Sequence, residues 1–160
     1  MSEDAPSGAR DGAVLSHALR TIRKYRGLTP REPARAMHMA PRTYQRFESG
    51  QTRLNFDHVH RFAAATRSDP QAILDAVAIG SSAYALRACE NQLSTILTVG
   101  VKNFNDLMGD RIQAFDSRTL ADAVIRMFES LANLQGDDPA SDWLKQGVND
   151  LKARRPRPGR

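Results

Sequence analysis

Apolar residues recur every three or four positions along most of the chain, which is the spacing of one face of an α-helix. The repeat predicts an all-α protein, with five helices in the first half whose apolar positions include Leu15, Leu19, Ile22, Met37, Tyr44, Phe47, Val59, Phe62, Ile73, Leu74 and Val77. Gly27 is expected to end the first helix. Thr29 is expected to cap the second, with Glu32 completing a capping box.

The second half repeats the pattern without any recognisable motif. One helix is expected over 82–101, with an apolar seam of Leu86, Cys89, Leu93, Ile96 and Gly100, and a second around 104–115. Asp116 is expected to cap a third helix, and Asp138 and Pro139 to begin a fourth. We therefore predict a disordered tail over 1–12, a domain over 13–79, a smaller helical module over 80–152 and a basic disordered tail over 153–160.

Residues 41–50 stand out because both ends of a short helix are marked. Pro41 suits the first helical position and Gly50 suits the left-handed residue that ends a helix. Tyr44 and Phe47 lie three residues apart and are expected to face the core. The remaining side chains are exposed and carry donors that suit base edges and phosphates, namely Arg42, Thr43, Gln45 and Arg46.

The charge is unevenly distributed along the chain. Residues 14–67 contain eleven Lys or Arg against three acidic residues, whereas residues 80–151 contain six basic and ten acidic residues. The last nine residues add five positive charges, which either contact phosphates or aid solubility. A basic solvated face is the simpler interpretation of residues 14–67. Because this basic segment contains the helix at Pro41, the charge pattern favours a protein that binds nucleic acid.

Other classes of function find little support. The single cysteine, Cys89, forms no internal disulfide and fits a reducing cytosol, where we expect it to pack inertly. No apolar run approaches the length of a membrane span, and the first residues do not resemble a signal peptide. His58 and His60 diverge on a helix, and no phosphate loop or nucleophile motif is present. We expect a cytoplasmic protein, associated with the nucleoid when bound to DNA, that is neither an enzyme nor a cofactor or metal binder.

Residues 15–77 resemble the helix-turn-helix domain of the Cro/cI family, also called the XRE family, of bacterial and phage regulators. The matching positions are Leu15, Leu19, Arg20, Ile22, Arg23, Arg26, Gly27, Leu28, Thr29, Glu32, Ala34, Met37, Thr43, Arg46, Phe47, Glu48, Gly50 and Leu74. The sequence departs from the family pattern at Pro30, at Pro33 and at His38, which stands at a turn position usually held by glycine and is expected to adopt the left-handed conformation.

The resemblance implies a five-helix, lambda-repressor-like fold that places the helix at Pro41 in the major groove of double-stranded DNA. It assigns base reading to the four exposed side chains of that helix: Arg42, Thr43, Gln45 and Arg46. Contacts to the DNA backbone fall to Arg31, Arg35, Gln51, Thr52, Arg53 and Asn55. It also implies that Glu48 pairs with a core-edge arginine, Arg23 or Arg20, rather than with DNA.

The family commonly binds two half-sites as a homodimer, so the C-terminal helices are expected to hold two copies together. The expected interface residues are Leu86, Leu93, Ile96, Phe104 and Met108. We therefore predict a sequence-specific repressor of promoters. Two alternatives stay open: a transcriptional activator, and an antitoxin-like module whose C-terminal helices bind another protein while its first half binds its own operator.

Overall fold

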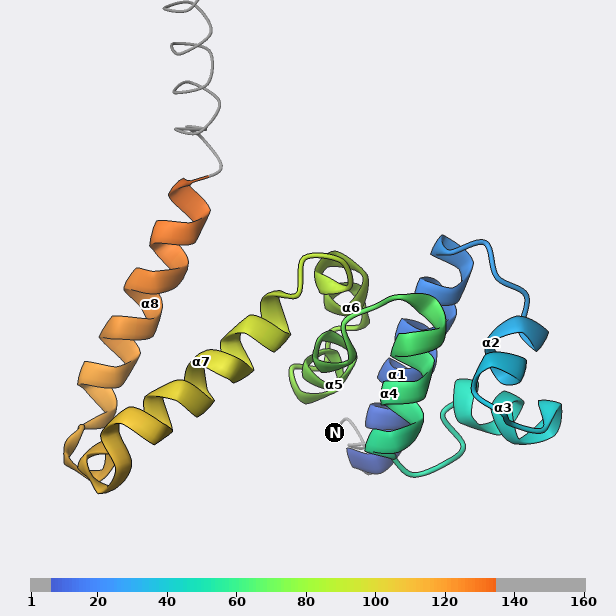
Figure 1. Ribbon diagram of the computed structural model, residues 1–160, viewed down its shortest axis with the longest axis horizontal. Coiled ribbons are helices and arrows are strands. Elements are labelled where there is room, and N and C mark those ends of the chain that lie inside the picture. The colour runs from blue at the N-terminus through green and yellow to red at the C-terminus, as the bar shows by residue number, and fades with distance from the viewer. Residues whose placement is uncertain (1–6, 135–160) are drawn as a thin grey trace, which may run out of the picture. The chain divides into compact units, whose positions relative to one another are not determined.

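The computed structural model describes residues 7–134, and every regular element in that range is helical (Figure 1). The elements are α1 (Ser7–Tyr25), α2 (Arg31–Ala36), α3 (Pro41–Glu48), α4 (Phe56–Thr66), α5 (Pro70–Ala78), α6 (Ser82–Ala88), α7 (Leu93–Met108), the 3-10 helix η1 (Gly109–Ala114) and α8 (Ser117–Asn133). The predicted all-α class, with further helices after the N-terminal domain, is confirmed. The fourth helix predicted at Asp138 and Pro139, the first half of the predicted N-terminal tail (1–6) and the C-terminal tail lie outside the described residues.

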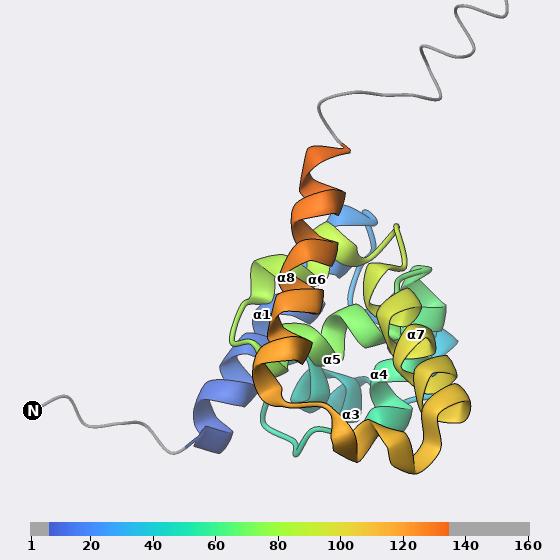
Figure 2. The ribbon, with the colours of Figure 1, turned by 90° about the vertical axis from the view of Figure 1, so that its left-hand side faces the viewer.

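The chain divides into two compact units, residues 1–107 and 108–160. In the first unit α1 packs against α3, α5 and α6, and α4 packs against α2 and α5 (Figures 1 and 2). The core between these helices contains Leu19, Ile22, Phe47, Phe62 and Ile73, each at most 1% exposed. Burying one such side chain contributes roughly 1.5–3 kcal/mol, so these apolar stripes hold the short helices together.

The first helix begins earlier than the sequence indicated. Residues 7–12 belong to α1, although they were expected to lie in a disordered tail. At Gly12 the first turns of α1 meet the turn that follows α3, so closely that a Cβ placed on Gly12 would lie 2.6 Å from the carbonyl oxygen of Gly50. The small residues that suggested disorder therefore permit a close approach of two backbones.

The first unit also extends further than the predicted domain boundary at residue 79. The helix α6 packs against both α1 and α5. As a result, three of its residues are at most 2% exposed: Ala85, Ala88 and the C-cap residue Cys89. Leu86, which we expected at a dimer interface, is half-buried against this same core. The structure therefore makes α6 part of the N-terminal unit.

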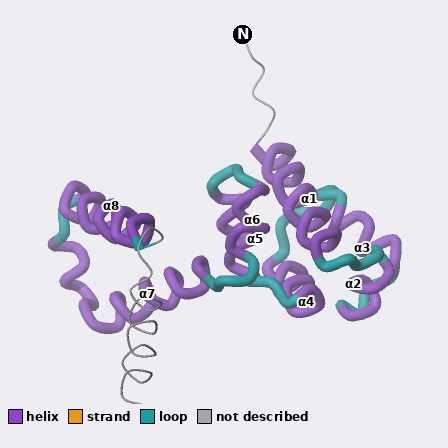
Figure 3. The backbone as a smooth tube through the Cα atoms, turned by 90° about the horizontal axis from the view of Figure 1, so that it is seen from above, coloured by secondary structure: helices purple, strands orange, loops and turns teal. Residues whose placement is uncertain are grey.

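The helix expected over 82–101 is two helices. Gln92 has φ 57° and separates α6 from α7, and the side-chain oxygen of Asn91 accepts a hydrogen bond from the Leu93 N–H at 3.0 Å. Conversely, the separate helix expected around 104–115 does not exist, since α7 continues to Met108 and is followed by η1. Figure 3 shows the loop between α6 and α7 as a short interruption of the helical tube.

The helix expected after Asp116 is present as α8. The Asp116 carboxylate accepts hydrogen bonds from the hydroxyl and the backbone N–H of Thr119, at 2.7 and 2.9 Å. These bonds lower the pKa of Asp116, because they favour its charged form. The N-cap predicted from the sequence is confirmed.

Candidate nucleic-acid interface

The short helix α3 begins and ends at the residues that mark it in the sequence. Ala40 is extended and Pro41 takes the first position of the helix, where its missing N–H costs no hydrogen bond. At the other end Gly50 has φ +71°, its N–H donates to the Phe47 carbonyl, and the Gln51 N–H donates to the Arg46 carbonyl. This left-handed ending satisfies the last carbonyls of the helix and turns the chain back toward α1.

The preceding turn joins α2 to α3. His38 has φ 53° there, as expected for a residue that replaces the usual glycine. At the start of α2, the carboxylate of Glu32 accepts hydrogen bonds from the N–H and the hydroxyl of Thr29, at 2.6 and 2.9 Å. These bonds lower the pKa of Glu32. The Thr29 hydroxyl therefore donates to Glu32 rather than accepting from the helix, so only half of the predicted capping box forms.

One face of α3 anchors it in the core. Tyr44 and Phe47 are each 1% exposed, and the Phe47 ring meets the rings of Phe62 and His58 edge to face, with centroids 6.2 and 5.5 Å apart. Such aromatic contacts stabilise by about 0.5–1.5 kcal/mol beyond the apolar area that they bury. The orientation of α3 is therefore fixed by its buried face.

A buried ion pair fixes α3 further. Arg23 of α1 donates from Nε to Glu48 at 2.5 Å and from Nη1 to the Leu28 carbonyl at 2.9 Å, while the Tyr44 hydroxyl donates to Glu48 at 2.8 Å. Hydrogen bonding to Glu48 raises the pKa of Arg23, and burial raises the pKa of Tyr44. The expectation that Glu48 pairs with a core-edge arginine is met by Arg23.

The opposite face of α3 is open to solvent. The four side chains assigned to base reading, Arg42, Thr43, Gln45 and Arg46, are all exposed. Arg42, Gln45 and Arg46 line a surface hollow of about 710 Å³ together with Gln51 and Arg20 of α1. The sequence analysis did not place Arg20 at this surface, although its position one turn before Arg23 on α1 was a signal that could have done so.

The residues assigned to the DNA backbone divide into two groups. Arg31, Arg35, Gln51 and Arg53 are exposed cations or amides on α2 and on the loop after α3. The hydroxyl of Thr52 is covered by protein, and the exposed Asn55 caps α4.

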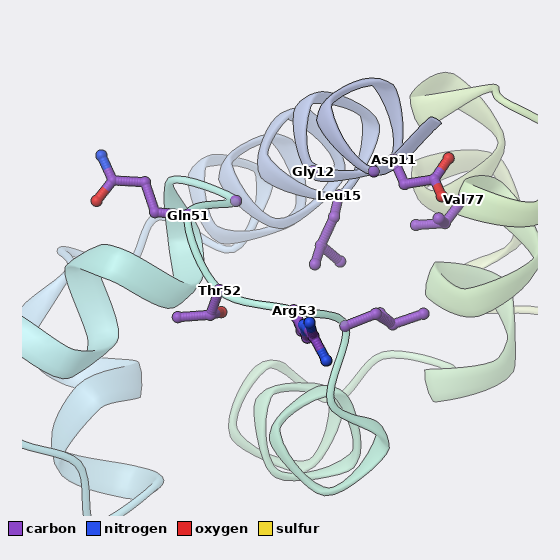
Figure 4. Close-up of a pocket in the computed structure, with 10 residues that line it drawn as sticks. Asp11, Gly12, Leu15, Gln51, Thr52, Arg53 and Val77 are labelled. Atoms are coloured by element: carbon purple, nitrogen blue, oxygen red, sulfur yellow. The ribbon is translucent and has the colours of Figure 1, made fainter. Parts of the chain in front are cut away.

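Thr52 lies beside a smaller hollow of about 300 Å³ lined by Asp11, Leu15, Arg53 and Val77 among others (Figure 4). Its hydroxyl oxygen is covered by protein and has no hydrogen-bond partner within residues 7–134. A phosphate cannot reach this hydroxyl in the conformation shown. Gln51, by contrast, points away from the hollow in Figure 4.

Asn55 is the N-cap of α4, and its side-chain oxygen accepts a hydrogen bond from the His58 N–H at 3.2 Å. Replacing such a cap by alanine costs about 0.5–2 kcal/mol. Asn55 thus has a structural role that we did not assign to it from the sequence, although the side chain is exposed.

The two helices α2 and α3, joined by a tight turn and presenting a basic, exposed second helix, define the DNA-binding class of helix-turn-helix proteins. Residues 14–75 match the protein family described as a helix-turn-helix domain, and this match fits the N-terminal DNA-binding domain of a regulator. The protein is accordingly a DNA-binding regulator in the general sense that such a domain defines. No curated protein and no solved structure matches the chain.

None of the helices within residues 7–134 is long and apolar enough to span a membrane. No group of three or more His, Cys, Asp or Glu side chains in the same range has the arrangement of a metal site.

Proposed function

We propose that this protein is a sequence-specific transcriptional repressor that binds promoter operators as a homodimer. The observation that carries the proposal is the division of α3 into two faces. Tyr44, Phe47 and Glu48 hold the helix in the core. The exposed residues of the opposite face, Arg42, Thr43, Gln45 and Arg46, present donors to solvent. A helix that is fixed on one side and basic on the other is suited to insertion into the major groove.

Within this proposal Arg42 and Arg46 lie one turn apart and each makes a bidentate contact to guanine, worth roughly 1–3 kcal/mol of discrimination. Gln45 reads adenine, and Thr43 contacts a thymine methyl group or a phosphate. Arg31, Arg35, Gln51 and Arg53 bind the sugar-phosphate backbone and set the position of the domain without reading sequence. Arg20 joins them, because it lines the same hollow as Arg42.

The homodimer is supported by the apolar face of α7. Ile96 is 60% and Phe104 38% exposed, and Leu93 and Met108 are half-buried on the same helix. Two-fold symmetric pairing of this face brings two recognition helices to two half-sites. Leu86 packs against the core of its own chain, so we do not include it in the proposed dimer interface.

Repression is favoured over activation by the surface of α2. Activators of the family that residues 15–77 resemble can contact polymerase through an acidic surface near the second helix. Here α2 carries Arg31 and Arg35, and its one carboxylate, Glu32, accepts hydrogen bonds from Thr29. We therefore propose that the protein acts by occluding promoters in the cytoplasm, through binding alone and with no cofactor or catalytic step. The antitoxin-like alternative predicts a second protein bound to the C-terminal helices.

Genome-wide DNA occupancy in the native host tests the proposal. The wild type is compared with the double variant Arg42→Ala, Arg46→Ala, and Arg87→Ala serves as a control because Arg87 is an exposed cation on α6. We expect promoter peaks with a two-fold symmetric motif that disappear in the double variant and persist in the control, with derepression of the adjacent genes. An absence of promoter peaks for the wild type would refute the proposal. If the genes at bound promoters are expressed less in the double variant than in the wild type, the protein is an activator.

A further inference from the structure

The helix α8 is apolar along one face and has none of that face buried. Leu120, Val124, Met127, Phe128 and Leu131 recur at spacings of three and four, and each is between 38% and 48% exposed. No residue of α8 is buried. The apolar face of this amphipathic helix therefore has no partner among residues 7–134 that buries it.

The two edges of this face differ in charge. At 100° per residue, Arg118 and Glu129 fall on the same edge, next to Ile125, whereas Thr119 and Ser130 fall on the other edge. Neither Arg118 nor Glu129 forms an ion pair within residues 7–134. One edge of the apolar face is thus charged with both signs, and the other is neutral.

When α8 is aligned antiparallel to a second copy of itself about Val124, large side chains face smaller ones and opposite charges lie close together. Pairing α8 with an antiparallel copy centred on Val124 places Leu120 opposite Phe128 of the copy, and the small Ala121 opposite the long Met127. In the same alignment Arg118 comes within one residue of Glu129 of the copy. In a two-fold antiparallel pair identical edges face each other, so the charged edges form two Arg–Glu pairs.

A parallel pair of α8 helices lacks this complementarity. In a parallel two-fold pair the charged edge of one copy faces the neutral edge of the other, so Arg118 and Glu129 lie opposite Thr119 and Ser130 and gain no partner of opposite charge. The parallel pair would also align the two helix dipoles in the same direction. Charge and side-chain size therefore select the antiparallel arrangement.

We infer that α8 pairs with α8 of a second copy of this chain in an antiparallel, two-fold symmetric contact centred on Val124. This inference rests on the homodimer of the proposed function and names a surface that the sequence analysis left out of the dimer interface. The occupant is a second copy because the charged and apolar positions both match under one two-fold axis. A different protein, or residues 139–151 of the same chain, has no reason to match that register.

Cysteine crosslinking of the full chain tests the register. The variants Val124→Cys and Leu131→Cys are compared after mild oxidation on a non-reducing gel, in a chain whose one native cysteine, Cys89, is 2% exposed. A disulfide needs Cα atoms within about 7 Å, which position 124 meets at the symmetry axis. The two copies of residue 131 lie about 21 Å apart along the helix axis in the antiparallel pair. We expect about tenfold more covalent dimer for Val124→Cys than for Leu131→Cys.

Each other outcome contradicts the inference. Equal crosslinking of both variants would show a parallel pair, and no crosslinking of either would show that another segment or another protein covers α8. Because no side chain of α8 is buried, neither substitution disturbs a core, and an unchanged helical circular dichroism spectrum verifies this.

Reversal of charge gives a second test that does not depend on cysteine chemistry. Arg118→Glu is expected to weaken dimerisation about threefold to tenfold by sedimentation, and adding Glu129→Arg to the same chain is expected to restore it. Failure of the double variant to recover would overturn the proposed pairing. Binding of the operator by α3 is measured separately with the Arg42→Ala, Arg46→Ala variant, so loss of the α8 contact and loss of the proposed function are distinguishable.

Discussion

The carboxylate of Asp69 binds Thr95 through both of that residue's donors. The Thr95 hydroxyl donates to Asp69 at 2.6 Å and its backbone N–H at 3.1 Å, and Asp69 also caps α5 by accepting from the Gln71 N–H. Asp69 is only 3% exposed, and its own N–H donates to the Cys89 carbonyl. One buried residue therefore joins three elements: its side chain contacts the start of α5 and the first turn of α7, and its backbone N–H contacts the end of α6.

Removing the Thr95 hydroxyl is expected to destabilise the fold. For Thr95→Val we expect a loss of about 1.5–3 kcal/mol in the free energy of unfolding, the usual value of a hydrogen bond to a charged group. Thr95→Ser keeps the hydroxyl and is expected to lose less than about 1 kcal/mol. Urea unfolding of both variants measures the difference, and equal losses would show that the hydroxyl contributes nothing.

The buried ion pair of α3 is expected to matter far more than an exposed one. Glu48→Gln leaves Arg23 without its carboxylate in a site where both side chains are about one-tenth exposed, so we expect a loss of roughly 3–5 kcal/mol. Asp57→Asn breaks an exposed i,i+4 pair with Arg61 and is expected to lose less than about 1 kcal/mol. Denaturant unfolding of the two variants checks this ordering, which a similar loss in both would contradict.

The glycine that ends α3 is expected to tolerate no side chain. A Cβ on Gly50 would lie 2.0 Å from the Gly12 carbonyl oxygen, in addition to the strain of φ +71°. Gly27 is the matched control, because its φ is +67° and nothing lies within 4 Å of the added carbon. We expect Gly27→Ala to cost about 1–2 kcal/mol and Gly50→Ala clearly more. Comparable melting temperatures for the two would show that α1 does not press against the end of α3.

Substitutions on the proposed interface are expected to separate base reading from backbone binding. Arg42→Ala and Arg46→Ala should each weaken binding to the cognate site far more than binding to random DNA. Arg53→Ala should weaken both alike and reduce the slope of log affinity against log salt by about one. Titrations over a range of salt concentrations measure both effects, and equal losses on both DNAs for all three variants would contradict the assigned roles.

The Cys89 thiol is expected to react slowly in the folded protein. Burial raises its pKa, because the low dielectric disfavours the thiolate, and the thiol also donates to the Leu86 carbonyl. Alkylation at pH 8 should be slower in buffer than in urea, because unfolding exposes the sulfur and removes the burial that raises the pKa of the thiol. Equal rates would place Cys89 at an open surface.

The elements that the sequence predicted well are those whose ends are set by neighbouring residues. Pro41, Gly50 and Asp116 act within one turn of their own helix, so their effects could be recognised from the sequence alone. The break at Gln92 could not, because neither glycine nor proline marks it and the apolar spacing continues through it. Its one local signal is Asn91, whose side chain caps the start of α7, and Asp69 adds a hydrogen bond to Thr95 from 26 positions away.

The candidate interface was predictable for a similar reason. Exposure of Arg42 and Arg46 follows from the helical period once Tyr44 and Phe47 are placed in the core. The covered hydroxyl of Thr52 and the hollow that includes Arg20 depend instead on how α1 approaches the loop after α3. That approach is set by the contact between Gly12 and Gly50, and residues that meet in this way carry no periodic signal.

The alternation of faces on α3 has a consequence for how such a protein changes over generations. Folding depends on Tyr44, Phe47 and Glu48, whereas the surface offered to DNA consists of the exposed positions on the opposite face of the helix. Exchanging Arg42, Gln45 and Arg46 for other polar residues leaves every core contact in place. Under the proposed function, a duplicated copy can therefore acquire a new operator by drift at three solvent positions, without first passing through an unstable intermediate.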